Sequence, residues 1–491
     1  METADILVVG TGAAGLFNAL QLPEKYKVLV ITKSEADQAD SFLAQGGMCM
    51  LLDDDDYDSY FEDTMKAGHY ENNKESVDIM IRSSQHIAQE LVDYGVDFQR
   101  DENGNFEFTR EGAHSENRIL FHEDLTGQEI TSKLLARARE RKNITIRENT
   151  TLVDIICDEK ANVCKGGIIR NADGTLEEVR TQAVVLATGG IGGLFQFSTN
   201  YRHITGDALA IAMRHHIEVE HINYIQIHPT TLYTTKPGRS FLISESVRGE
   251  GAYLYNKDGE RFVNELLPRD VVSQAICKQM EKDGRPYVEL SVTHLDPDFV
   301  RNRFPNIYRQ CLKEGYDMTK EPIPVTPGQH YFMGGIKVNS DSETSMDGLY
   351  AAGETSCNGV HGRNRLASNS LLESLVFAER AANHIAETVE AGKPMPTDEI
   401  PFDPAFYADI DEKNRTEVLK AIKRKDEAFY DQWLDHDAEY GPGHHHRPAR
   451  GCNQRGCQHQ RHYAPAAAGQ GGADLQAGRY YLRSGCICTC I

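Results

Sequence analysis

Short apolar runs, each followed by a stretch with helical spacing, form the main pattern at the start of the chain. The first run, at positions 6–9, leads through a glycine-rich turn into an apolar stretch that predicts a helix over 16–22. A second apolar run predicts a strand over 26–32, at the distance expected for a βαβ unit. Helical spacing then returns over 76–94. This pattern predicts an α/β fold with parallel strands.

Two later apolar runs, at 183–187 and 348–353, also predict buried parallel strands that end in glycine. Ligands bind beside the carboxyl ends of such strands, so three distant strand ends are expected to face one ligand. The nucleotide domain is therefore expected to be interrupted by an inserted domain. The predicted divisions are 1–227 and 337–395 for the two segments of the nucleotide domain, 228–336 for the insertion, 396–440 for a C-terminal helical region, and 441–491 for an atypical tail.

The first turn has the spacing G-x-G-x-x-G, with glycines at 10, 12 and 15. Such a turn lets the backbone approach a pyrophosphate, and the helix that follows presents free N–H groups to the anion. The motif alone also fits a structural βα turn, but a strand before it and a helix after it favour a nucleotide site. Lys33 stands where an NAD site carries an acid. A plain NAD-dependent dehydrogenase is therefore not the first choice.

The net charge of the chain disfavours some classes of binding partner. The 491 residues carry a formal net charge of -22 at pH 7, which argues against nucleic acid or an anionic membrane as a partner. No apolar run is long enough for a membrane span, and the acidic start leads directly into a core strand, so a cytoplasmic protein is expected. Six of the 11 cysteines are scattered without metal-ligand spacing, and no metal site is expected among them.

Several polar side chains are hard to explain as structure alone. They lie in the loops 39–47 and 110–115 and in the predicted insertion, and another polar loop, 361–373, is expected to run into a helix that Ser368, Asn369 or Ser370 caps. Each residue alone is more often a surface or capping residue, and 110–115 by itself fits a turn with a surface charge pair. Together, histidines, arginines and hydroxyls beside a cofactor would form a carboxylate pocket, because arginine offers a bidentate fork to a carboxylate.

Seven of these motifs together resemble one superfamily of flavoproteins, that of succinate dehydrogenase, fumarate reductase and L-aspartate oxidase. Their order and spacing hold over about 4–435, and the segments are 10–15, 44–47, 187–190, 228–230, 268–270, 330–335 and 364–366. Three longer segments, 110–120, 265–272 and 365–373, are similar to the L-aspartate oxidase branch. The respiratory flavoproteins typically carry Gly-Gly where Ala367 and Ser368 stand, and a flavin-linking histidine where Asp40 stands.

The resemblance implies an FAD domain in two segments, an inserted α+β capping domain and a C-terminal helical region. It also implies FAD bound without a covalent link. The residues at the family's FAD positions are Gly10, Thr11, Gly12, Ala13, Ala14, Gly15, Lys33, Asp40, Ser41, Phe42, Leu43, Ala44, Gln45, Gly46, Gly47, Asp207, Glu354, Ser370 and Leu371.

The resemblance also implies a dicarboxylate substrate and the residues that hold it. His228, Ser244, Glu245, His330 and Arg365 are expected to bind the substrate, Glu111 to orient its amine, and Arg269 to exchange a proton. Ser244 stands where threonine is more usual, and a guanidinium is almost always protonated, so a base role for Arg269 would strain that rule. The expected reaction is oxidation of L-aspartate to iminoaspartate, with oxygen or fumarate as acceptor. It would be the first step of quinolinate and NAD biosynthesis, coupled to quinolinate synthase.

Two other functions stay open from the sequence. The chain could be the flavoprotein subunit of a fumarate reductase or succinate dehydrogenase, although Asp40 and Ala367 with Ser368 speak against it. It could also be a flavin-binding protein that has lost catalysis, for which the C-terminus is the only motivation. The physiological electron acceptor and the oligomeric state do not follow from the sequence.

The composition changes abruptly after about position 440. A cluster of histidines, five cysteines and many glycines follows, with almost no acids. The cysteines at 452 and 457 and those at 486, 488 and 490 lack paired two-residue spacing, so the preferred interpretation is translation out of the original frame rather than a metal site. We expect this tail to have no stable packing.

Overall fold

A five-stranded parallel sheet lies at the centre of the larger part of the protein, in a computed structural model that describes residues 2–393 and 402–434. Its strand order is β19-β11-β2-β3-β7, and every neighbouring pair is parallel. Strand β19 follows the other four only after a long intervening stretch of chain, so two separate segments of the chain build the sheet. The strands are β2 (Ile6–Val9), β3 (Val28–Ile31), β7 (Ile144–Arg147), β11 (Ala183–Leu186) and β19 (Leu349–Ala351).

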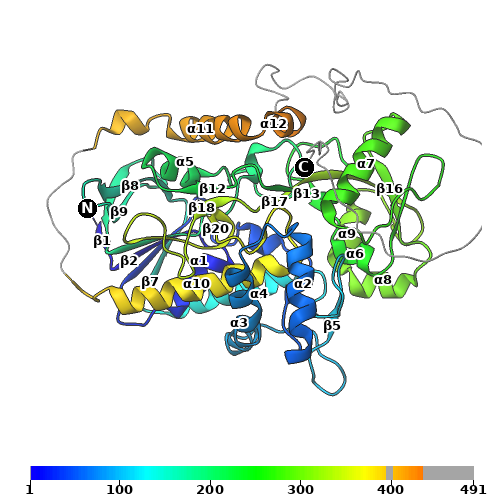
Figure 1. The fold of residues 1–491 in the computed structure, drawn as a ribbon, viewed down its shortest axis with the longest axis horizontal. Helices are drawn as coiled ribbons and strands as arrows, with labels where there is room; N and C mark the ends of the chain where they lie inside the picture. Colours follow the sequence, from blue (N-terminus) through cyan, green and yellow to red (C-terminus); the bar gives the residue numbers. More distant parts are fainter. Residues whose placement is uncertain (1, 394–401, 435–491) are drawn as a thin grey trace, which may run out of the picture.

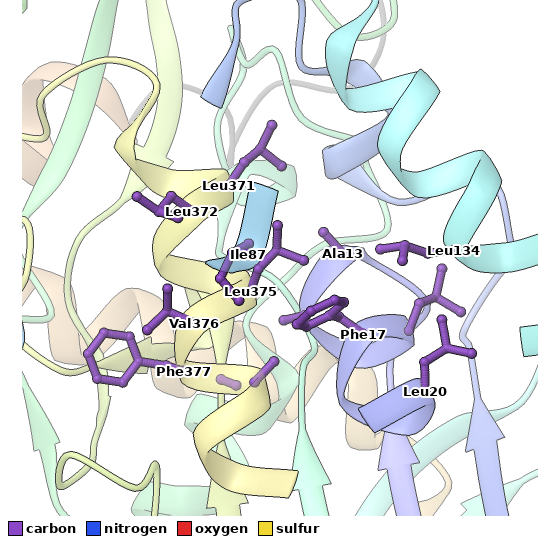
Figure 2. Packing of buried hydrophobic residues seen from close by; sticks show 14 of the residues in the cluster. Ala13, Phe17, Leu20, Ile87, Leu134, Leu371, Leu372, Leu375, Val376 and Phe377 are labelled. Atoms are coloured by element: carbon purple, nitrogen blue, oxygen red, sulfur yellow. The ribbon is translucent and has the colours of Figure 1, made fainter. Parts of the chain in front are cut away.

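Both faces of this sheet are buried, which explains why its strands are continuously apolar. In β2, Ile6 and Val8 belong to one hydrophobic core, and Leu7 and Val9 belong to the other. The first core is covered by helices in which Phe17 packs beside Leu375 (Figure 2). These helices are α1 (Ala13–Gln21), α3 (Lys74–Asp93), α4 (Thr126–Glu140) and α10 (Asn369–Thr388). The α/β fold predicted from the sequence is confirmed.

The second core is closed by the C-terminal helices. Helix α5 (Asp207–Arg214) packs beneath α11 (Ile410–Lys425), which crosses the top of the molecule in Figure 1 together with α12 (Glu427–Trp433). The described part of the expected C-terminal helical region, 396–440, contains these two separate helices, because Asp426 leaves the helical conformation and its carboxylate accepts the Phe429 N–H at 3.0 Å. The predicted tail, 441–491, lies outside the described residues, as do 394–401 and 435–440.

A second, antiparallel sheet and four helices form the region at the right of Figure 1. Its two longest strands, β13 (Ile225–Leu232) and β17 (Ile323–Phe332), run side by side and connect this region to the rest. They begin and end near the expected limits 228 and 336, and the division into domains stays a prediction. The other elements are β14 (Phe241–Leu242), β15 (Tyr253–Tyr255), β16 (Val288–Ser291), α6 (Glu245–Gly249), α7 (Arg269–Asp283), α8 (Pro297–Arg303) and α9 (Pro305–Lys313).

Three small sheets complete the described fold. They contain β1 (Glu2–Thr3), β8 (Thr151–Asp158), β9 (Val163–Arg170) and β10 (Leu176–Arg180); β4 (Met48–Cys49), β5 (Phe108–Thr109) and β6 (Ile119–Leu120); and β12 (Val219–Glu220), β18 (Gly335–Lys337) and β20 (Ser356–Cys357). Helix α2 (Tyr57–Ala67) lies beside α3. Within the described residues, no helix has the length and apolar character to cross a membrane.

Candidate functional site

A long cavity runs from the carboxyl ends of the parallel strands to the antiparallel sheet. Its empty space is ≈ 1720 Å³, a figure that includes the part open to solvent. All seven expected catalytic and substrate-binding residues line it: Glu111, His228, Ser244, Glu245, Arg269, His330 and Arg365. Of the expected cofactor-binding residues, only Gly15 and Phe42 do not line it. The cavity therefore brings the expected cofactor-binding and substrate-binding residues to one continuous space.

The glycine-rich turn forms one wall of the cavity. Its glycines are required because neighbouring backbone segments lie too close to leave room for a side chain. Gly10 has φ 117°, and a Cβ there would lie 2.0 Å from the carbonyl oxygen of Ala187. A Cβ at Gly15 would lie 2.0 Å from the carbonyl oxygen of Gly10, so Gly15 lets the helix pack against the turn. Helix α1 starts at Ala13, three residues earlier than the predicted 16–22, which brings its N-terminus to the cavity.

Residues that line this end of the cavity carry buried polar atoms with no hydrogen-bond partner among the described residues. Among these atoms are Thr11 Oγ1, Asp40 Oδ2 and Gln45 Oε1. Burying such atoms without a partner is costly, so a polar ligand is expected to pair with them. Burial raises the pKa of Asp40 to about 7 and, with the charge of Asp40 nearby, raises the pKa of Glu354 to about 8. These residues fit the hydroxyl-rich and amide-rich groups of a flavin dinucleotide.

An ion pair lies on another wall of the same end. Lys33, just after β3, places its Nζ 2.7 Å from Oδ2 of Asp207, the first residue of α5. Lys33 Nζ also donates to the carbonyl oxygen of His203 at 3.1 Å and to Thr205 Oγ1 at 3.2 Å. Because its charge is already paired, Lys33 fixes the edge of the cavity rather than offering a free cation.

Two neutral histidines lie at the other end of the cavity, on the neighbouring strands β13 and β17. Their ring centroids are 5.1 Å apart. Burial, together with the nearby cations Arg269 and Arg365, holds the pKa of both His228 and His330 well below the usual range. Each is therefore an uncharged hydrogen-bonding group at neutral pH.

A bulge in β13 sets the orientation of His228. The strand register shifts between His228 and Thr231, at Pro229, which has no N–H to pair with β17. The Thr230 N–H donates to His228 Nδ1 at 3.1 Å, so the ring proton lies on Nε2. Nε2 is buried and has no partner within the described part of the chain. His228 thus offers a hydrogen-bond donor to whatever fills the cavity.

Two arginines stand beside the histidines, and both are buried. Arg269 begins α7, and its Nε donates to Glu245, while its Nη1 donates to Gln226 Oε1 at 2.8 Å. Although burial opposes it, the charges of Arg269 and Arg248 lower the pKa of Glu245. The arrangement keeps a charged guanidinium at the cavity wall.

Arg365 is the less neutralised of the two. Its Nη1 donates to Ser370 Oγ at 2.8 Å, its guanidinium lies 4.6 Å from the ring centroid of Tyr331, and its Nε has no partner among the described residues. Burial lowers the pKa of Arg365 to about 10, which still leaves it charged at neutral pH. A buried cation without a carboxylate partner is an anion site.

Glu111 also lines the cavity, and serine hydroxyls rather than an arginine hold its carboxylate. Its Oε1 accepts a hydrogen bond from Ser246 Oγ at 2.7 Å, and its Oε2 accepts one from Ser368 Oγ at 2.5 Å. The alternative of a surface turn at 110–115 is wrong for this residue, because Glu111 is only 4% exposed. The site therefore combines cationic and neutral donors with a carboxylate, that of Glu111, which serines hold in place.

The expected cap of α10 is confirmed in its position, Ser368, but not in its hydrogen bond. Ser368 holds the N-cap position with φ 63°, but its hydroxyl makes no capping bond and donates to Glu111. Ser370 accepts from Arg365, and the Asn369 side chain bonds Tyr60 and Thr64. All three polar groups are used by tertiary contacts, which outweigh a local cap.

Several residues of the site have no signal in the sequence. Gln226 bridges Arg269 to the carbonyl oxygen of Arg365, Thr199 bonds the His330 ring at 2.7 Å, and Ser246 bonds Glu111. Arg239 also lines the cavity. The run 244–246 is unusually rich in polar residues, and this is the one feature that pointed toward Ser246.

The fold and the glycine turn define a flavoprotein: the family model described as FAD binding domain matches residues 5–371. The cofactor is accordingly FAD. Within these proteins the chain belongs to the L-aspartate oxidase family, because curated relatives of that name are 42–50% identical to it over more than three quarters of its length. The L-aspartate oxidase of Clostridium perfringens is 50% identical over 79% of this chain and 88% of its own length, and that of Synechocystis sp. is 42% identical over 77% and 70%.

Solved structures agree on the fold. A quinol fumarate reductase of E. coli has a TM-score of 0.75 and 30% identity, covering 86% of this chain and 75% of its own. This fold is therefore shared with a protein whose sequence identity to this chain is lower than that of the L-aspartate oxidases above.

Proposed function

We propose that this protein binds FAD without a covalent link and oxidises L-aspartate to iminoaspartate, with oxygen or fumarate as the electron acceptor. The observation that carries the proposal is Glu111, a buried carboxylate that is held by two serines and has no arginine partner among the described residues, and that lines the same cavity as Arg365 and His228. Such a cavity offers complementary charge to a substrate with both carboxylates and an ammonium group. Asp40 stands where a flavin-linking histidine would be expected, which supports a non-covalent cofactor.

The chain's own residues bind and orient the substrate in this proposal. Arg365, His228, Ser244 and His330 hold its carboxylates, and Glu111 accepts from its ammonium group. Arg269, whose guanidinium Glu245 and Gln226 fix in place, exchanges a proton with the substrate. When bound, FAD would supply the oxidising chemistry as the acceptor of a hydride from Cα, and the proton that the amine loses would pass to a nearby group. The protein's contribution is to fix Cα in one orientation beside the flavin.

We also propose that the activity occurs in the cytoplasm and feeds quinolinate synthase. The chemical reason is that iminoaspartate is an imine, which water hydrolyses, so the enzyme that consumes it must act soon after its release. This reaction would be the first step of quinolinate and NAD biosynthesis.

The direct test is anaerobic mixing of the FAD-loaded protein with L-aspartate while the flavin absorbance is followed. Loss of the oxidised flavin band is expected with L-aspartate and not with succinate. If succinate bleaches the flavin reversibly and aspartate does not, the chain is instead the flavoprotein subunit of a fumarate reductase or succinate dehydrogenase.

A further inference from the structure

The carboxylate of Glu111 is held by two serine hydroxyls that come from different parts of the chain. Ser246 lies in α6 of the antiparallel region, and Ser368 immediately precedes α10. Each donates its single proton to a different carboxylate oxygen, at 2.7 and 2.5 Å. A carboxylate has about four acceptor positions, so this leaves acceptor capacity on both oxygens for a third donor.

Ser368 occupies a backbone conformation that serine rarely adopts. Its φ of 63° and ψ of 2° lie in the left-handed region, where glycine has no steric penalty. Three hydrogen bonds hold it there: its carbonyl accepts from Cys49 N at 3.0 Å, its hydroxyl accepts from Gly47 N at 3.2 Å, and the same hydroxyl donates to Glu111. Strain of this kind persists where the surroundings fix it, and it gathers at functional sites.

The hydroxyl of Ser246 contacts Glu111 and not the space where a ligand would bind. Ser246 is buried, and it is not among the residues that line the cavity. Its hydroxyl accepts from Ser244 Oγ at 3.1 Å and donates onward to Glu111. A Cβ added to Gly46 would lie 2.7 Å from Glu111 Oε1, so the backbone at Gly46 packs closely against this oxygen, while Glu111 still lines the cavity. Glu111 is thus confined to one orientation.

We propose that Ser246 and Ser368 are positioning residues that give the enzyme its preference for a substrate with an amine. By fixing both oxygens of Glu111, they leave the carboxylate ready to accept from an ammonium group without rearrangement. A dicarboxylate without an amine makes no such contact, so the two serines favour an amino acid as the electron donor and leave fumarate reduction largely unaffected. This inference rests on the proposed function.

The test compares Ser368→Gly and Ser246→Ala with the wild-type holoenzyme. Glycine at 368 removes the hydroxyl and fits the left-handed backbone, so the conformation is retained. For each variant, kcat/KM for L-aspartate oxidation is expected to fall about 10- to 100-fold, the range for loss of a hydrogen bond to a charged group. The kcat/KM for fumarate reduction and the affinity for succinate are expected to change less than about threefold.

Ser342→Gly is the matched control. Ser342 is also a fully buried serine with φ 63°, and its hydroxyl donates to the carbonyl oxygen of Phe377 at 2.9 Å, but it does not line the cavity. We expect its ratio of aspartate oxidation to fumarate reduction to equal that of the wild type. A similar loss of aspartate oxidation in Ser342→Gly would overturn the inference, because loss of any buried serine would then have the same effect.

A double variant separates positioning from general structure. If the serines act through Glu111, adding Ser368→Gly to Glu111→Gln lowers aspartate oxidation no further than Glu111→Gln alone. A further loss, or equal losses in aspartate oxidation and fumarate reduction, overturns the inference. If Ser368→Gly does not retain FAD, Ser246→Ala makes the same test. A wild-type protein that does not oxidise aspartate overturns the proposed function as well, whereas unchanged variants of an active enzyme overturn only the roles of the serines.

Discussion

The two arginines of the site differ in how fully their charges are balanced. Arg269 is bonded to Glu245 and Gln226, whereas Arg365 is bonded to the neutral Ser370 and stacks on Tyr331. A substrate carboxylate therefore gains more from Arg365, and Arg269 is better suited to act beside the reacting atoms. Their loss should consequently affect different kinetic constants.

We expect Arg365→Leu mainly to weaken binding of aspartate and fumarate, and Arg269→Leu mainly to slow flavin reduction while FAD stays bound. Each should cost about 2–4 kcal/mol in transition-state stabilisation, as expected for charge-assisted hydrogen bonds. Rapid mixing over a range of substrate concentrations separates the two effects. Wild-type reduction rates in both variants at saturating aspartate would show that the roles are wrongly assigned.

Glu111→Gln should reduce aspartate oxidation far more than fumarate reduction, because an amide is a weaker acceptor for an ammonium group than a carboxylate. A charged hydrogen bond in a buried site contributes about 1.5–3 kcal/mol. Steady-state kcat/KM values for both reactions give the comparison. Equal losses in both would make Glu111 a structural residue of its loop.

The buried carboxyl of Glu354 should make FAD binding depend on pH. Burial first, and then the charge of Asp40, raises its pKa to about 8, so it is protonated at pH 6.5 before the cofactor binds. A raised carboxyl pKa means that the folded apoprotein binds more protons than the unfolded chain. Its free energy of unfolding should therefore fall as pH rises from about 4.3 towards 8.

Cofactor hydroxyls that donate to Glu354 favour its ionised form, so the affinity for FAD should increase between pH 6.5 and 8.5. Fluorescence titration of the apoprotein with FAD measures this trend. In Glu354→Gln the increase of affinity with pH should be smaller, and the increase that remains is the contribution of Asp40. An affinity for FAD in the wild type that stays constant or falls with pH would contradict the assigned contact.

At the scale of elements, the turn between β2 and α1 predicts a contrast between two glycines. Gly10→Ala should lower the free energy of unfolding by about 2 kcal/mol or more, because φ 117° and a 2.0 Å approach to Ala187 exclude a side chain. A Cβ at Gly12 would meet side chains alone, Ser41 Oγ at 3.3 Å and Ala39 Cβ at 3.8 Å, so Gly12→Ala should fold normally and bind FAD less tightly. Thermal unfolding of the two apoproteins, with FAD titration, checks both statements. Equal unfolding temperatures would show that the turn tolerates a side chain at both positions.

The elements that the sequence predicts best are those encoded by a local pattern of residues. The apolar strands at 6–9 and 183–186 and the glycine turn were predicted within a residue or two, since each is a local pattern. The hydrogen bond of Glu111 with Ser368 joins residues 257 positions apart, and no local pattern encodes it. The bulge at Pro229 that orients His228 likewise depends on pairing with β17, and the polar groups expected to cap α10 are used in tertiary contacts instead.

At the scale of the whole molecule, the C-terminal helices close the second core, and the ring of Phe429 lies 6.2 Å from that of Phe195. The composition of 441–491 predicts a tail that adds nothing to this packing. Limited proteolysis of the full chain should remove the tail and leave FAD bound, as judged by mass and absorbance. A protease-resistant, zinc-dependent C-terminal fragment would show that the tail folds.

Gln226 connects the two main parts of the molecule through one side chain. Its Nε2 donates to Asn364 Oδ1 at 2.9 Å and to the carbonyl oxygen of Arg365 at 2.8 Å, while its Oε1 accepts from Arg269. Because both of its amide hydrogens are bonded and the residue is 2% exposed, they should exchange with solvent deuterium only when the antiparallel region moves away from the FAD-binding part. A single isotope-labelled amide would thus report in an NMR spectrum how often the substrate cavity opens.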